Sequence, residues 1–369
     1  MKQIMEDILV TKSFLPPIAE YQEYLQKVWD SSWLTNSGPL VLELEKKMAE
    51  LLGVKHFLYT SNGTIAIQMV IKALELDGEI ITTPYSYVAT TSSVIWENCK
   101  PVFADIDSET LCLDPKEVEK KITDKTVAIL PVHVYGVPCD VEAFEALSKK
   151  FNIPVIYDAA HAFMTQYKES SVLNFGTAST LSFHATKLFH TVEGGAIVTN
   201  DDELAKKLAL VRSFGHVGDE HFRLGVNGKN SEIHAAMGLT NLKYVNDILI
   251  KRKELSTLYD QQLEKLLASG KLKRPVVREA VHYNHAYYPV LFESHEKMMA
   301  VNDLLRTERI FARRYFFPSL NTISYIQGES CPISESVAER VLCLPLYHDL
   351  CSDQVIRITQ LITERIELL

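Results

Sequence analysis

Residues 182–200, SFHATKLFHTVEGGAIVTN, place a lysine and a glycine pair between two strand-like runs. The strand-like start of this stretch runs into a single lysine, Lys187, and a second apolar run, 196–199, follows the glycine pair Gly194-Gly195. Lysine prefers water, and glycine pairs occur where the backbone bends or another group approaches closely. A lysine between two strands of buried character therefore needs a specific role.

Outward from this stretch, short β-branched runs alternate with amphipathic helical patterns over the first two-thirds of the chain. Such alternation, with strands that are apolar throughout, predicts an α/β fold with a mainly parallel central sheet and helices on both faces. The candidate strands are 56–60, 79–83, 102–105, 127–131, 154–158, 180–183 and 196–199.

The pattern changes near Ser231. One long helical segment, 231–267, leads into two expected strands within 271–294, a helix at 295–306 and a closing helix at 352–369 with Ser352 as its N-cap. We therefore expect two domains, a large one at residues 1–245 and a smaller α+β domain at 246–369.

Composition excludes several classes of protein. The 369 residues are 47% hydrophobic and carry a formal charge of −9, so no global positive field would attract nucleic acid or an anionic membrane. The first residues are too charged for a secretory signal, and no apolar run is long enough to span a membrane. The six cysteines form no CxxC pair and no zinc-like spacing. We expect a cytoplasmic protein with no metal site.

Ligands of open parallel sheets bind beyond the carboxyl ends of the strands. Strand 56–60 is followed by Ser61-Asn62-Gly63-Thr64, a small turn that opens a helix and suits a phosphate, although an ordinary N-cap would look the same. Strand 154–158 ends in Asp158, with His161 three residues later, and Ser182 and Lys187 follow the next strand.

Together these groups match the needs of pyridoxal phosphate. Its phosphate needs helix-end amides and hydroxyls, its pyridine nitrogen needs a carboxylate, and its aldehyde needs a lysine amine to form a Schiff base. Tyr87, after strand 79–83, could stack on the ring. A nicotinamide site would need G-x-G-x-x-G, but no two glycines are spaced as GxG, and the Walker pattern is also missing.

Several segments resemble the DegT/DnrJ/StrS family of nucleotide-sugar aminotransferases. They include WLTNSGPLVLELEKKMAELLGVKH (33–56), SNGTIAIQMVIKAL (61–74), YDAAHAF (157–163), the opening stretch and LGVNGKNSEIHAAMGL (224–239). The resemblance implies a fold-type-I homodimer. In it Lys187 is the Schiff-base lysine, Asp158 the partner of the pyridine nitrogen and His161 a neighbour of the phenolate oxygen.

The resemblance assigns further contacts. Gly63, Thr64 and Ser182 hold the phosphate, Tyr87 stacks on the ring, and Asn227 reaches the phosphate in the other subunit. Lys229 replaces the arginine of a GYNYR-like string and loses its bidentate fork. His184, Lys229, Arg313 and Tyr315 are the candidate substrate contacts.

Within this family, WLTNSGP and ARRYFFPSL (312–320) are most similar to enzymes that aminate carbon four of dTDP-4-keto-6-deoxy-D-glucose. We therefore expect L-glutamate as the amino donor, dTDP-4-amino-4,6-dideoxy-D-glucose as the product, and a role in O-antigen or other lipopolysaccharide biosynthesis. Two alternatives stay open: amination at carbon three, and a non-catalytic member that senses a ligand.

Overall fold

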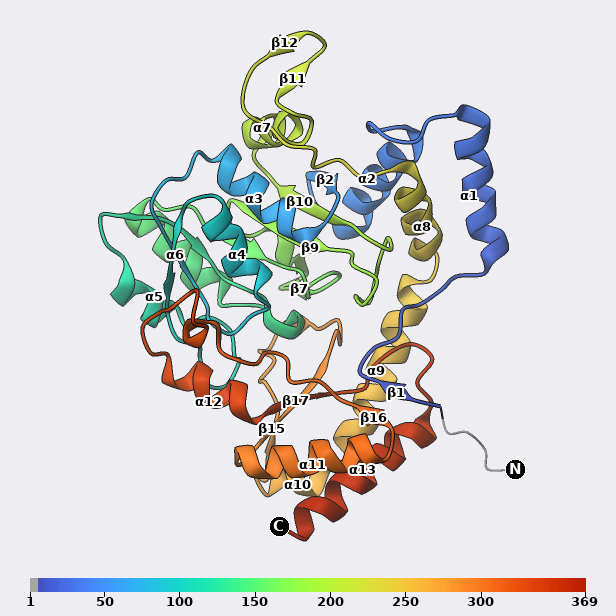
Figure 1. Cartoon of the computed structure of the whole chain (residues 1–369), viewed down its shortest axis with the longest axis vertical. Coiled ribbons are helices and arrows are strands. Elements are labelled where there is room, and N and C mark those ends of the chain that lie inside the picture. Colours follow the sequence, from blue (N-terminus) through green and yellow to red (C-terminus); the bar gives the residue numbers. More distant parts are fainter. Residues whose placement is uncertain (1–5) are drawn as a thin grey trace.

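The computed structural model describes residues 6–369, and two sheets form its centre (Figure 1). One has the strand order β4-β3-β5 and is parallel throughout, and the other has the order β2-β10-β9-β6. Parallel bridges from Ile129 to Val155 and from Val132 to Asp158 join β5 to β6. The strands are β2 (His56–Thr60), β3 (Glu79–Thr82), β4 (Lys100–Phe103), β5 (Thr126–Leu130), β6 (Ile156–Asp158), β9 (Ala178–Ser182) and β10 (Gly195–Thr199).

The predicted α/β fold with a mainly parallel sheet is confirmed, and β10 is the exception. It pairs antiparallel with both β2 and β9. No crossover helix separates β9 from β10, so the chain returns directly along its neighbour, and a parallel pair would need a long crossover. The loop that makes this return carries Lys187.

Successive side chains of β10 pack into two different cores, which explains why helices cover both faces of the sheet. Ala196 and Val198 pack in the same core as α2 (Pro39–Leu52) and α8 (Glu232–Leu242), whereas Ile197 packs with α3 (Gly63–Ala73) and α7 (Asp202–Arg212). Successive side chains of a strand point to opposite faces, so five apolar or small residues in a row require cover on each side. The other helices of this part are α1 (Ile18–Ser31), α4 (Ala89–Trp96), α5 (Pro115–Lys121) and α6 (Val141–Phe151).

A smaller antiparallel sheet, β13-β15-β17, lies near the C-terminus and is packed by α9, α11 and α13 (Figure 1). Its core also takes Ile8, because β1 pairs in parallel with β16. The domain boundary at 245/246 stays a prediction. The pairing of β1 with β16 joins the first described residues to the C-terminal core. The elements are α9 (Val245–Gln262), α10 (Glu264–Ala268), β13 (Leu272–Lys273), β15 (Tyr288–Phe292), α11 (His295–Thr307), β16 (Ile310–Phe311), α12 (Pro332–Arg340), β17 (Val341–Leu344), α13 (Ser352–Glu367) and β1 (Ile8–Leu9).

Three local expectations differ from the structure. The expected continuous helix 231–267 is divided into α8, α9 and α10, and the residue that precedes α13 is Cys351 rather than the expected cap Ser352. The segment 271–294 holds a third short strand, β14, which pairs with β7 of the larger part. The remaining short strands are β7 (Gln166–Tyr167), β8 (Ser170–Ser171), β11 (His216–Val217), β12 (Glu220–His221) and β14 (Val281–His282). None of the helices in residues 6–369 combines the length and apolar character that a bilayer span requires.

Candidate active site

A cavity of about 370 Å³ lies where β6 and β9 end. Asp158 is the last residue of β6, Ser182 is the last residue of β9, and the N-terminus of α3 forms another wall. Three sequence-distant elements thus meet at one sheet edge, as expected for an α/β ligand site. The predicted residues that line this cavity are Gly63, Thr64, Tyr87, Asp158, His161, Ser182, His184, Lys187, Arg313 and Tyr315.

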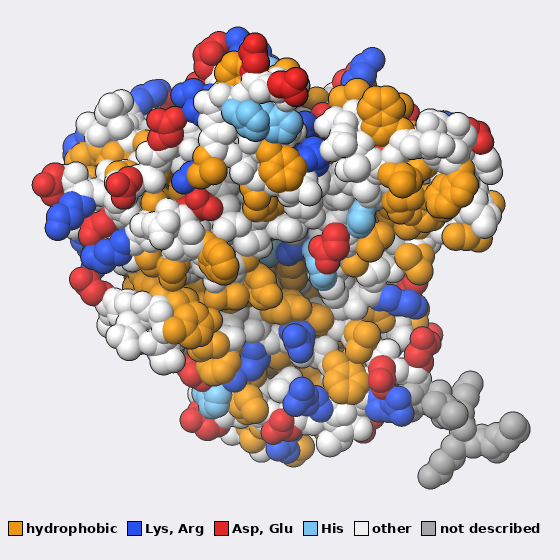
Figure 2. Space-filling view, turned by 45° about the horizontal axis from the view of Figure 1, so that its top comes forward, with side chains coloured by type: hydrophobic (Ala, Val, Ile, Leu, Met, Phe, Trp, Pro, Cys, Tyr) orange, Lys and Arg blue, Asp and Glu red, His pale blue; other side chains and the backbone are white. Residues whose placement is uncertain are grey.

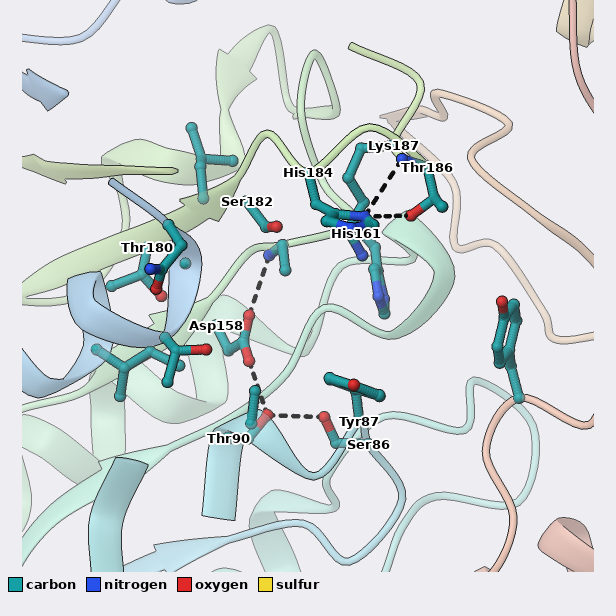
Figure 3. Close-up of a pocket in the computed structure, with 18 of the residues that line it drawn as sticks. Ser86, Tyr87, Thr90, Asp158, His161, Thr180, Ser182, His184, Thr186 and Lys187 are labelled. Atoms are coloured by element: carbon teal, nitrogen blue, oxygen red, sulfur yellow. Dashed lines mark hydrogen bonds between the residues drawn. The ribbon is translucent and has the colours of Figure 1, made fainter. Parts of the chain in front are cut away.

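Asp158 is a buried carboxylate held by two hydrogen bonds. Its Oδ2 accepts a hydrogen bond from the Thr90 hydroxyl at 2.7 Å, and its Oδ1 accepts one from the Ala160 amide at 3.0 Å (Figure 3). Burial raises the pKa of Asp158, while these two hydrogen bonds and the charge of Lys187 lower it in part. Within residues 6–369 no basic side chain lies within ion-pair distance of this carboxylate, so it is free to face a positively charged ligand group.

The amine of Lys187 points into the cavity rather than into bulk water. This position explains why a lysine lies between two buried strands. Its Nζ donates a hydrogen bond to the Tyr287 hydroxyl at 3.4 Å. The surrounding protein lowers the pKa of Lys187 by desolvation, and the Asp158 charge opposes that effect. A lysine with a lowered pKa is more often neutral near pH 7, and a neutral amine can act as a nucleophile or a base.

His161 lies on the same wall, flanked by aromatic rings. Its ring stacks on Phe316 with centroids 5.6 Å apart and packs edge-on against Tyr287 at 4.9 Å. Desolvation holds the pKa of His161 well below its usual range, and the Lys187 charge adds to the effect. The imidazole is therefore neutral, and its Nδ1 accepts a long hydrogen bond, 3.3 Å, from the Tyr135 amide.

The turn before α3 has free amides of the kind that an anion site needs. The Asn62 side chain caps the helix by accepting a hydrogen bond from the Ile65 amide at 2.8 Å. No acceptor within the described part of the chain takes the Gly63 and Thr64 amides, which are two of the N–H groups that a helix start leaves free. These amides and the positive end of the helix dipole suit a phosphate.

The glycine pair of the opening stretch allows β10 to lie against this turn. A Cβ atom on Gly195 would come within 2.4 Å of the Asn62 carbonyl carbon and 2.7 Å of the Gly63 nitrogen. A Cβ on Gly63 would lie 3.0 Å from the Ser182 Cβ. Side chains at Gly195 would displace backbone atoms, so glycine is required for the close approach of these three segments.

The remaining predicted contacts differ in exposure and position. Tyr87 is 62% exposed at the cavity wall, and the exposed His184 bonds through Nδ1 to the Thr186 hydroxyl at 2.8 Å. Asn227 and Lys229 do not line this cavity. They lie beyond the β11–β12 hairpin, where the Lys229 Nζ donates to the Asn227 Oδ1 at 3.0 Å.

The cavity residues that the sequence analysis did not single out include Ser86, Thr90, Tyr287 and Phe316. Ser86 and Thr90 form a hydrogen-bonded pair at 2.8 Å that ends on Asp158 (Figure 3). Their proximity to the predicted Tyr87 was a usable signal, since all three follow the same strand. Tyr287 and Phe316 come from the C-terminal part, and no local pattern predicts that they reach this cavity.

Comparison with known proteins defines the class of enzyme. Residues 18–363 match the DegT/DnrJ/EryC1/StrS aminotransferase family, so the chain belongs to that family and is an aminotransferase. The family membership expected from the sequence is thereby confirmed. Pyridoxal phosphate is the cofactor of these enzymes, and the described residues fit it: free helix-start amides, an unpaired buried carboxylate and a lysine amine share one cavity.

The most informative relatives are full-length matches. A dTDP-4-amino-4,6-dideoxy-D-glucose transaminase of Shigella dysenteriae is 41% identical over 94% of this chain and 95% of its own length. One of Escherichia coli with the same name is 38% identical over 96% and 98%. The crystal structure of DesI with its TDP-sugar product is 31% identical, with a TM-score of 0.93 over 99% of this chain and 95% of that chain.

Proposed function

We propose that this enzyme transfers the amino group of L-glutamate to carbon four of dTDP-4-keto-6-deoxy-D-glucose, giving dTDP-4-amino-4,6-dideoxy-D-glucose. The observation that carries the proposal is the full-length similarity to two transaminases named for that product. The likeness to DesI, described with a TDP-sugar product, supports the same substrate class. The product would serve O-antigen or other surface-polysaccharide synthesis in the cytoplasm.

Each of the central cavity residues would have its own role in the reaction. Bound pyridoxal phosphate supplies an electron sink for the substrate carbon that loses or gains a proton. Lys187 would hold the cofactor through its amine and, once released, move a proton to and from that carbon, for which its lowered pKa is suited. Asp158 would hold the proton on the pyridine nitrogen, and the neutral His161 would lie beside the phenolate oxygen.

The other predicted residues would bind and orient the cofactor and the substrate. The amides of Gly63 and Thr64 and the Ser182 hydroxyl would take the phosphate, and Tyr87 would cover the ring. His184, Arg313 and Tyr315 line the cavity and are proposed substrate contacts. Asn227 and Lys229 lie outside their own subunit's cavity, which supports a homodimer in which they complete the partner's site.

Covalent attachment tests the central role. After borohydride reduction, peptide mass spectrometry should locate the cofactor on Lys187, and Lys187→Ala should lower turnover by at least about 10³-fold, since both binding and proton transfer are lost. Lys207→Ala, an exposed lysine of α7, is the matched control and should keep full activity. Normal turnover by Lys187→Ala would refute the mechanism.

Substrate identity is tested by a panel of dTDP-, UDP- and GDP-linked keto sugars with L-glutamate, followed by mass spectrometry and NMR of the product. We expect amination of the dTDP-4-keto sugar at carbon four. Amination at carbon three would favour the first alternative. A protein that shows no half-reaction with glutamate or any other amino donor would instead be the ligand-sensing alternative.

A further inference from the structure

Residues 10–14 form a short connection that we call the strap. It directly follows β1, which pairs in parallel with β16 and packs in the C-terminal core. The Leu346 amide donates a hydrogen bond to the carbonyl of Val10, the first strap residue, at 3.0 Å. The start of the strap is therefore fixed to the C-terminal part.

The loop that carries Lys187 is anchored unevenly. Leu188 and Phe189, which follow the lysine, are buried in the same core as α2 and α8. His184 and Thr186, which precede it, are exposed and line the active-site cavity. Figure 2 shows that one face of the molecule is hollowed near its centre, as a cavity open to solvent requires. A chain segment that borders a cavity has packing partners on one side only, so apolar contacts hold the half before Lys187 less firmly.

Two strap hydroxyls hold the half of the loop before Lys187. The Ser13 Oγ donates to the Ala185 carbonyl at 2.7 Å, and the Thr11 Oγ1 donates to the Thr186 carbonyl at 3.2 Å. In the described part of the chain, no other group donates to either carbonyl. The paired residues are 172 and 175 positions apart in the sequence, so these bonds depend on how the strap packs and not on local chain geometry.

His190 holds the loop to the strap on the other side of Lys187. Its Nε2 donates to the Phe14 carbonyl at 2.7 Å, and its Nδ1 accepts a hydrogen bond from the Val192 amide at 3.2 Å. Desolvation lowers the pKa of His190, so the ring is neutral and carries one N–H, which these two bonds assign to Nε2. The strap therefore contacts the loop both before and after Lys187.

The strap approaches Lys187 without sharing its cavity. Thr11 and Ser13 do not line the active-site cavity. Val10 and Thr11 instead line a separate small cavity of about 20 Å³, together with Tyr287, whose hydroxyl accepts the hydrogen bond from the Lys187 amine. The two hydroxyl residues thus act on Lys187 through its backbone, which defines a positioning role rather than a catalytic one.

We propose that Thr11 and Ser13 are positioning residues for Lys187, because they fix the two carbonyls before it and so direct its amine into the cavity. The inference rests on the proposed function, in which Lys187 holds the cofactor. Attachment joins the lysine nitrogen to the aldehyde carbon by a double bond, while the two amine hydrogens leave with the aldehyde oxygen as water. This step requires the nitrogen to lie within bonding reach of the aldehyde, so its rate depends on the position of the loop. No proposed cofactor contact comes from the strap itself.

Two ligands of the apoprotein test the proposal. Pyridoxal phosphate can attach to Lys187, whereas pyridoxine phosphate has a hydroxymethyl group in place of the aldehyde and can only bind. Thr11→Val and Ser13→Ala should each slow attachment about three- to tenfold, measured by borohydride trapping at timed intervals and peptide mass spectrometry. The dissociation constant of pyridoxine phosphate should stay close to the wild-type value, because its phosphate and ring sites are unchanged. Thr11→Ser keeps the hydroxyl and should attach the cofactor at the wild-type rate.

Lys12→Gln is the matched control, since Lys12 lies between the two positioning residues and pairs with Asp349 at 3.4 Å. It should attach pyridoxal phosphate and bind pyridoxine phosphate as the wild type does. Wild-type attachment rates in both hydroxyl variants overturn the positioning role but leave the proposed function intact. Equal weakening of both ligands also overturns it, because the substitutions then disturb the whole site. If the wild-type protein binds pyridoxal phosphate but borohydride fixes none of it on Lys187, the role proposed for Lys187 fails, and the positioning role fails with it.

Discussion

At the scale of single residues, the charge state of Asp158 depends on a side chain that lies far away in the sequence. The Thr90 hydroxyl donates to its Oδ2 at 2.7 Å, and Ser86 in turn lies 2.8 Å from the Thr90 hydroxyl. Burial alone would push the carboxyl toward its neutral form, so this short chain helps to keep the charged form available. Thr90 thus acts on the cofactor site through Asp158.

Thr90→Val is the sharpest test of that dependence, because it keeps the shape and removes the hydroxyl. The lost hydrogen bond should raise the pKa of Asp158 further, so the carboxylate is lost at a higher pH than in the wild type. The acid limb of the pH–activity profile should therefore move to higher pH, and activity near pH 7 should fall by about three- to tenfold.

A double-mutant cycle supplies the control for Thr90→Val. In an Asp158→Asn background, removal of the threonine hydroxyl should add little further loss, since its acceptor has changed. Equal losses in both backgrounds would show that Thr90 acts independently of Asp158. An unchanged acid limb in the single variant would also contradict the assignment.

At the scale of elements, Gly195 allows the start of β10 to pack closely against the turn before α3. Gly195→Ala would place a Cβ 2.4 Å from the Asn62 carbonyl carbon, and backbone atoms cannot yield as a flexible side chain can. We expect the turn to shift and cofactor affinity to fall by at least about tenfold. Fluorescence titration of the apoprotein with pyridoxal phosphate measures this loss.

Ala196→Gly, on the next residue of the same strand, is the control for Gly195→Ala. It removes a methyl group and adds no contact with the turn, so cofactor affinity should stay close to that of the wild type. Similar losses in both variants would mean that β10 stability, rather than the close approach at Gly195, controls the site.

A side chain of α8 caps the N-terminus of helix α2. Glu232 is almost completely buried, and its two carboxylate oxygens accept the Leu40 and Val41 amides at 2.7 and 3.0 Å. Glu232→Ala would leave two buried N–H groups without partners, at a cost of about 3 kcal/mol. The thermal unfolding midpoint of the variant should fall by several degrees.

Glu43→Ala is the matched control for Glu232→Ala, since Glu43 lies on α2 in an exposed ion pair with Lys47. Surface pairs of this kind contribute about 0.5 kcal/mol, so its midpoint should barely change. A Glu232→Ala midpoint equal to that of the control would show that the contact with α2 is not important for stability.

Local signals explain which elements the sequence predicts well. Apolar strands bounded by turns are predicted correctly, because burial on both faces leaves a continuous apolar run. The helix 231–267 is mispredicted as continuous, because apolar residues recur through the breaks near Lys243-Tyr244 and Leu263. The start of α13 is also displaced by one residue, since Ser352 lies inside the helix and the Cys351 amide donates to the Gln354 side chain.

At the scale of the whole molecule, the sequence predicts the sheet edge of the cavity, whereas on its C-terminal wall it predicts Arg313 and Tyr315 but not Tyr287 or Phe316. Asp158, Ser182 and Lys187 follow strands, so the carboxyl-end rule brings them together. Tyr287 and Phe316 reach the same cavity only because the C-terminal part packs against the sheet, and this packing leaves no periodic trace in the chain.

The proposed homodimer makes a further prediction about Asn227, which lies near the base of a projecting hairpin and outside its own subunit's cavity (Figure 1). If each site combines Lys187 of one subunit with Asn227 of its partner, Lys187→Ala and Asn227→Ala homodimers should both be impaired.

A hybrid of the two variants contains one intact site and one doubly defective site. The purified hybrid should therefore have about half of the wild-type activity per dimer, and an unpurified random mixture about one quarter. Co-expression with two affinity tags, followed by tandem purification, isolates the hybrid for assay. If the purified hybrid is no more active than the Asn227→Ala homodimer, Asn227 serves its own subunit or no site at all.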